Sequence, residues 1–102
     1  MAEIKHQNNE KNGVFEIYED GVKAGEMTYT WAGTDKFIID HTGVDEAFNG
    51  KGYAKQLIYA GVEYAREKGI KIIPLCSFAK KTIEKTLQFQ DVLSWNFLIF
   101  LK

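Results

Sequence analysis

A β-like segment passes into a helix-like one at Val44-Asp45-Glu46-Ala47-Phe48-Asn49-Gly50-Lys51-Gly52-Tyr53-Ala54. The two glycines allow the backbone to curl there and to approach a ligand closely. Successive N–H groups would then face one concavity, and the first turn of a helix would add unpaired donors and the positive end of its dipole. We therefore expect a pyrophosphate to bind this loop, with Lys51 adding a positive charge. A tight turn that binds nothing is the alternative.

The residues before this loop predict an antiparallel meander of three strands. Residues 14–19 are rich in β-forming side chains, and Asp20-Gly21 follows as a two-residue hairpin turn. Apolar and polar residues alternate over residues 23–31, and a third strand is expected over residues 36–44. Residues 1–12 are polar, and we expect them to be disordered.

The residues after the loop predict a helix, a buried strand and a second helix. Apolar residues at spacings of three, four and seven predict a helix over residues 52–68, which Gly69 would end. Residues 70–75 are nearly all apolar, as in a strand covered on both faces, and Ser77 is a candidate N-cap for a helix over residues 78–87. This order indicates one α/β domain, of the layered α+β kind, over residues 1–102.

The composition of the 102 residues limits the classes of function. The net charge of −1 argues against generic binding to nucleic acid or to an anionic membrane. One cysteine and two histidines offer neither an internal disulfide nor the spacing of a metal site, so no metal is expected. A free thiol, with no export signal and no long apolar run, favours a cytoplasmic protein. We expect a monomer or a weak dimer. The apolar residues 95–102 are expected to form a final strand or a patch for a partner.

Two common phosphate motifs do not fit the loop. A Walker loop needs Ser or Thr after the Lys, and a dinucleotide fingerprint needs a glycine where Lys55 stands. Instead, Asn49-x-x-Gly52-x-Ala54 resembles the acetyl-CoA motif of the GNAT (GCN5-related N-acetyltransferase) superfamily, whose first residue is usually Gln or Arg. The wider set is similar to the very small GNAT-like acetyltransferases over residues 13–92: Asp40-His41-Thr42-Gly43-Val44, Gly50-Lys51-Gly52, Leu57 and Pro74-x-Cys76-Ser77-Phe78-Ala79.

The resemblance implies a truncated GNAT acyl-CoA N-acyltransferase fold, a mostly antiparallel mixed sheet with two main helices. It implies that acetyl-CoA is the cosubstrate and that the strand through Val44 splays from the one ending near Cys76 to admit it. The cofactor-binding residues would be Val44, Asn49, Gly50, Lys51, Gly52, Tyr53 and Ala54, with Tyr53 acting through its backbone N–H. The acceptor would be a primary amine, on a small molecule or a protein lysine.

Two residues are candidates for the chemistry. Cys76 precedes a helix N-terminus, where a thiol's pKa can fall, and the resemblance gives it the place of an active-site residue. It could carry the acetyl group or protonate the departing thiol; an inert buried cysteine is the alternative. His41 could be a general base or a structural histidine, and strand alternation would put it on the opposite face from Asp40. His6 is expected to lie in the tail, and Glu63, Arg66, Glu67 and Lys68 on a solvated helix face.

The chain departs from the family pattern at positions that bear on catalysis. Phe78 stands where many relatives carry a tyrosine, and Thr86-Leu87 where many carry His-Pro. A non-catalytic module that retains coenzyme A, as a sensor or partner subunit, is therefore the alternative function. A purely structural domain is a third reading.

Overall fold

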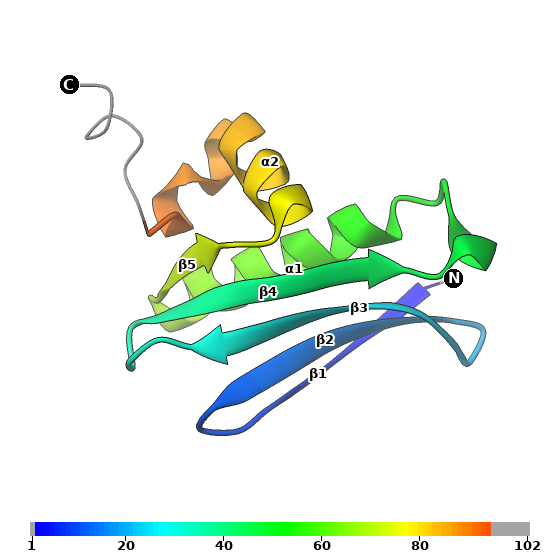
Figure 1. The fold of residues 1–102 in the computed structure, drawn as a ribbon, viewed down its shortest axis with the longest axis horizontal. Coiled ribbons are helices and arrows are strands. Elements are labelled where there is room, and N and C mark those ends of the chain that lie inside the picture. Colours follow the sequence, from blue (N-terminus) through cyan, green and yellow to red (C-terminus); the bar gives the residue numbers. More distant parts are fainter. Residues whose placement is uncertain (1, 95–102) are drawn as a thin grey trace.

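The computed structural model describes residues 2–94 of the chain (Figure 1). Five strands form one sheet in the order of the sequence, with the first four antiparallel and the fifth parallel to the fourth. The strands are β1 (Ala2–Asn8), β2 (Asn12–Glu19), β3 (Val22–Trp31), β4 (Lys36–Val44) and β5 (Lys71–Pro74). The expected mixed, mostly antiparallel sheet with two main helices is confirmed.

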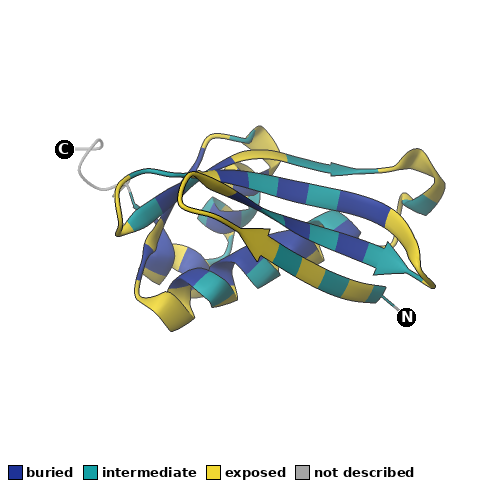
Figure 2. Cartoon of the chain, turned by 90° about the horizontal axis from the view of Figure 1, so that it is seen from below, coloured by how far each residue is buried: buried dark blue, intermediate teal, exposed yellow. Residues whose placement is uncertain are grey.

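Helices supply the second layer. The crossover from β4 to β5 contains α1 (Tyr53–Lys68), and α2 (Ser77–Lys85) follows β5. Two short 3-10 helices, η1 (Glu46–Phe48) and η2 (Leu87–Val92), stand before α1 and after α2. The apolar stripe expected on the first helix packs against the sheet, and the core lies between the two layers (Figure 2). The buried residues of α1 are Tyr53, Leu57, Ile58, Gly61, Val62 and Ala65.

The opposite face of the sheet carries no helix within residues 2–94, and we call it the open face. Its side chains come from alternate strand positions, which are intermediate or exposed where their neighbours are buried. They are mostly polar, and Lys23 bridges Glu16 and Glu26 there. The open face includes Lys5, Gln7, Val14, Glu16, Lys23, Glu26, Thr28, Thr30, Asp40 and His41.

The N-terminal segment is ordered, so the expectation of disorder over residues 1–12 is wrong for β1. This strand pairs with β2 along its whole length, from Ala2 opposite Glu19 to Asn8 opposite Gly13. Ala2 and Ile4 pack against the core, and His6 stacks on Phe15 with ring centroids 3.9 Å apart. His6 is therefore not a tail residue. Of the inward positions only Ile4 carries a large apolar side chain, so the two-residue alternation is weak in the sequence.

Local signals place the turns and the helix ends. Asp20 and Gly21 both have positive φ, 51° and 82°, as the Asp-Gly turn requires. Gly69 ends α1 in the left-handed conformation with φ of 69°. Cys76, rather than Ser77, is the N-cap of α2, and Ser77 is its first helical residue.

The expectation for residues 95–102 lies outside the described residues. Within residues 2–94 none of the helices has the length and apolarity to cross a membrane.

Candidate cofactor and active site

The loop between β4 and α1 has the curled backbone that its glycines predict. Gly50 and Gly52 adopt φ of 81° and 77°, and Gly52 is the N-cap of α1. Because glycine has no side chain, no side-chain hydrogen bond caps this end of the helix. The N–H groups of the first turn therefore remain available to a ligand, and the helix dipole favours an anion there.

A pocket of about 280 Å³ lies at this helix end. It includes six of the seven cofactor-binding residues expected from sequence: Val44, Asn49, Gly50, Gly52, Tyr53 and Ala54. Phe48, Lys55 and Phe78 complete the lining. Of these three, Phe78 comes from α2, and only the fold brings it to the loop.

Lys51 is absent from the lining of this pocket because its side chain is engaged elsewhere. Its Nζ lies 2.7 Å from Oε1 of Glu19, and the Tyr53 hydroxyl donates to the same oxygen. The hydrogen bonds from Lys51 and Tyr53 lower the pKa of the Glu19 carboxyl, and Glu19 in turn raises the pKa of Lys51. This contact could not be predicted from the sequence, because Glu19 lies at the end of β2, 32 residues before Lys51.

The strands β4 and β5 separate next to the pocket. Their ladder ends where Ile39 pairs with Pro74, and the N–H groups of Leu75 and Cys76 both lie 3.2 Å from the Ile39 carbonyl oxygen. Beyond this point β4 continues to Val44, whereas the chain after Cys76 turns into α2. The edge of β4 over residues 40–44 is therefore not paired with β5, and its backbone groups can pair with an extended ligand.

Cys76 lies at the mouth of this gap, partly buried. Burial raises the pKa of its thiol, but the backbone N–H of Ala79 and the hydroxyl of Thr42 stabilise the thiolate. The backbone N–H of Phe78 acts in the same direction, and the pKa of Cys76 is lowered from its usual value. A helix N-terminus lowers thiol pKa values in this way. The sequence pointed to the helix end but not to Thr42, which comes from β4.

His41 lies on the open face, next to an irregularity in β4. The register shifts there, so that Thr28 pairs with His41 and Tyr29 with Ile39, and Asp40 has no register partner in β3. Thr28 and Thr30 lie on the open face, and the Thr30 hydroxyl donates to Asp40 Oδ2 at 2.7 Å. Asp40 and His41 therefore share this face. The expectation that they lie on opposite faces is wrong, because a bulge interrupts strand alternation.

The two candidate catalytic residues are on different sides of β4. Thr42, beside Cys76, pairs with the buried Met27 and faces the helices, whereas His41 pairs with Thr28 on the open face. The ring of His41 covers Gly43, where a Cβ atom would lie 2.8 Å from His41 Nε2. The structure therefore does not join them in a direct pair. The edge of β4 that is unpaired among residues 2–94 lies between them.

Comparisons with known proteins agree with this arrangement. A family model described as GCN5-related N-acetyl-transferase matches residues 14–92. A solved GCN5-like protein from Staphylococcus aureus is 41% identical, with a TM-score of 0.69, and the match covers 89% of this chain and 86% of that one. Protein NATD1 of Xenopus tropicalis is 25% identical over 85 residues, which are 82% of this chain and 78% of that protein.

A more distant structure shares the fold. The aminoglycoside N-acetyltransferase AAC(6')-Iy, solved in complex with CoA, is 18% identical, with a TM-score of 0.60, over 81% of this chain and 88% of that one.

Proposed function

The chain belongs to the GCN5-related N-acetyl-transferase family, and from this premise we propose that it binds acetyl-CoA and transfers the acetyl group to a primary amine. The observation that carries the proposal is the uncapped N-terminus of α1 behind two left-handed glycines. Such a cradle offers several N–H groups and a positive dipole end to a pyrophosphate. The CoA complex of AAC(6')-Iy, a protein of the same fold, supports this choice of ligand.

The pantetheine arm of the cofactor would lie along the unpaired edge of β4. Residues 40–44 there offer backbone donors and acceptors to the amides of the arm, as a neighbouring strand would. This path runs from the pocket at Val44 towards Cys76, so the thioester would lie where the two strands separate. To contact the phosphates, Lys51 would have to break its ion pair with Glu19.

The reaction we propose is attack of a neutral amine on the thioester carbon. The N–C bond forms, the C–S bond breaks, and coenzyme A leaves as a thiolate that takes up a proton. His41 would remove the proton of the ammonium acceptor. Cys76 would either protonate the departing thiolate or first accept the acetyl group itself. Its lowered pKa supports the second role, because only the thiolate attacks well.

A calorimetric titration with coenzyme A tests the binding step. We expect saturable binding by the wild-type chain and binding at least about tenfold weaker for Gly52→Ala, because a Cβ atom strains the left-handed conformation of the cradle. Gly69→Ala is the matched control. It changes the other end of the same helix, where φ is also left-handed and where a Cβ atom meets nothing within 4 Å either. Equal affinity in the two variants, or no binding by wild type, would contradict the proposal.

A non-catalytic CoA-binding module is the second candidate. Two observations favour it: Phe78 gives the pocket no phenol, and His41 lies across β4 from Cys76. Intact-mass measurement after incubation with acetyl-CoA tests the covalent route. That route adds one acetyl group to the wild-type chain and none to Cys76→Ala. Steady release of coenzyme A with a panel of amines marks turnover, and turnover without an acetylated chain marks direct transfer. Saturable binding with neither outcome would establish the module.

A further inference from the structure

A second pocket, of about 380 Å³, lies on the open face between the β1–β2 turn and Asp40. We propose that it is the acceptor site and that it accepts one primary ammonium group on a hydroxyl-rich skeleton, as in an amino sugar. This assignment rests on the proposed acetyl transfer. The volume is within the range of small-molecule sites in proteins.

The charge of the pocket selects a cation. Asp40 is the one charged side chain in its lining among the described residues. Its Oδ2 accepts from the Thr30 hydroxyl at 2.7 Å, which fixes the carboxylate, and its Oδ1 has no hydrogen-bond partner within residues 2–94. A fixed carboxylate with one free oxygen binds an ammonium group by a charge-assisted hydrogen bond. Lys23, elsewhere on the open face, does not compete, because it is held between Glu16 and Glu26.

The rest of the lining selects hydroxyl groups. Gln7 and Asn12 contribute amides, each with donors and an acceptor, and Thr28 adds a hydroxyl. These neutral groups match alcohols, which both donate and accept. A polyamine would leave its further ammonium groups without a carboxylate in this pocket, so a single cationic group fits better.

The position of Asp40 connects this pocket with the cofactor site. Asp40 follows Ile39, whose carbonyl oxygen lies 3.2 Å from the Cys76 N–H at the point where β4 and β5 separate. It also precedes His41, the candidate base on the same face. Because no strand within residues 2–94 pairs with the β4 edge beyond Ile39, a molecule on the open face can reach a thioester at that edge.

A titration with D-glucosamine, followed by ¹⁵N–¹H spectra of the uniformly labelled chain, tests the assignment. We expect saturable shifts at Gln7, Asn12 and Thr28, and binding at least tenfold weaker for Asp40→Asn. The matched control is Asp35→Asn, an exposed carboxylate on the β3–β4 turn that is paired with Lys36, and it should bind like wild type. D-glucose, which lacks the ammonium group, should bind wild type at least tenfold more weakly.

Three results would overturn the inference: no saturable shifts with glucosamine, equal affinity of Asp40→Asn and wild type, or equal affinity for glucose and glucosamine. The last comparison needs no variant and so does not depend on the folding of one. Coenzyme A is titrated into the same samples. Binding of coenzyme A without glucosamine binding removes the acceptor assignment and leaves the proposed function. Binding of glucosamine without coenzyme A removes both, because an acceptor site needs a donor.

Discussion

His6 is a polar side chain inside an aromatic cluster. Its ring stacks on Phe15, meets the edge of Tyr64, and its Nε2 lies 2.6 Å from the Tyr29 hydroxyl. Burial lowers the pKa of His6 from its ordinary value of 6.5. Burial also raises the pKa of Tyr29 to about 12, so the phenol stays protonated at neutral pH.

Acid should therefore destabilise the fold through His6. Since its pKa is lower in the folded chain, the unfolded chain binds the proton more readily, and the free energy of unfolding falls as the pH drops below 6.5. Glu16, Glu19 and Asp91 have lowered pKa values too, but they titrate below about 4.5. Urea unfolding between pH 7.5 and 5.5 measures the effect.

His6→Phe isolates this contribution. The variant keeps a ring on Phe15 but cannot titrate, so its unfolding free energy should change less between pH 7.5 and 5.5 than that of wild type. It should also lose about 1–3 kcal/mol at pH 7.5, because the buried Tyr29 hydroxyl loses a partner. An unchanged pH slope would show that the imidazole is not the titrating group.

Site residues could be predicted where their signal was local. Gly50, Gly52 and Cys76 stand at helix ends that the sequence itself marks. Two contacts could not be predicted, because they join separate strands and helices: Glu19 with Lys51, and Thr42 with Cys76. The bulge at Asp40 is also a property of strand pairing, so alternation alone misplaced that residue.

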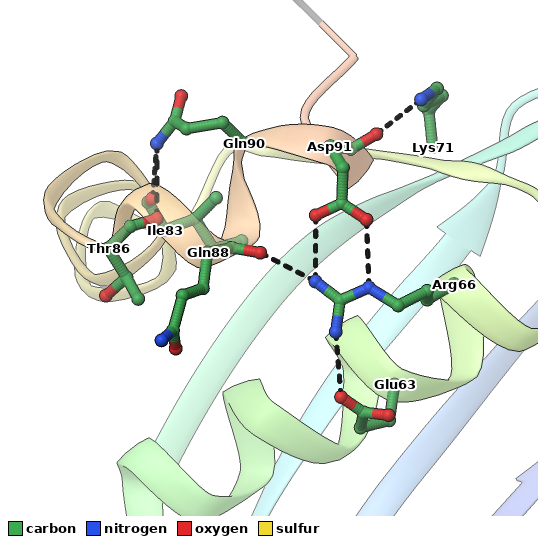
Figure 3. Close-up of polar contacts among 8 residues, drawn as sticks. All are labelled: Glu63, Arg66, Lys71, Ile83, Thr86, Gln88, Gln90 and Asp91. Carbon is green, nitrogen blue, oxygen red and sulfur yellow. Dashed lines mark hydrogen bonds and ion pairs between the residues drawn. The ribbon is translucent and has the colours of Figure 1, made fainter.

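The helix α1 contacts η2 through the Tyr59–Phe89 ring pair and through polar contacts of Arg66 (Figure 3). Arg66 holds the Asp91 carboxylate with two bonds of 2.8 Å, and it also donates to the Gln88 carbonyl at 2.6 Å. The Asp91 pKa is lowered by this contact. The sequence placed Arg66 on a solvated helix face. In the structure it also joins α1 to η2. The Gln90 amide donates to the Ile83 carbonyl at 2.8 Å, so η2 also holds the C-terminal end of α2.

Replacing this arginine should loosen η2 without unfolding the sheet. For Arg66→Gln we expect amide hydrogen exchange over residues 87–92 to rise roughly three- to tenfold, because the exposed pair stabilises a local unit. Exchange in β2 and β3 should stay as in wild type. Lys68→Gln removes a cation from the same last turn of α1, and it should change neither region. Equal exchange in both variants would show that the Asp91 contact does not hold η2.

The sheet as a whole depends on its first strand. The sequence predicted the meander of β2 to β4 and the helical crossover, because hydrophobic periodicity and glycine signals are local. It did not predict β1, because Ile4 is the one large apolar side chain among its inward positions and the alternation is therefore weak. This strand forms because it pairs with β2, and its own composition does not predict it. Its last residues line the pocket on the open face.

Removal of residues 1–11 should therefore destabilise the whole molecule. The loss should be about 2–4.5 kcal/mol, because the burial of an Ile stabilises by roughly 1.5–3 kcal/mol and an aromatic pair by about 0.5–1.5. The truncation also leaves β2 as an open edge, which favours aggregation. Urea unfolding and light scattering measure both effects. Within the full chain, Ile4→Ala should cost more than Lys5→Ala, since Ile4 faces the core and Lys5 the open face. Equal stability of truncated and full chains would show that β1 adds nothing to the fold.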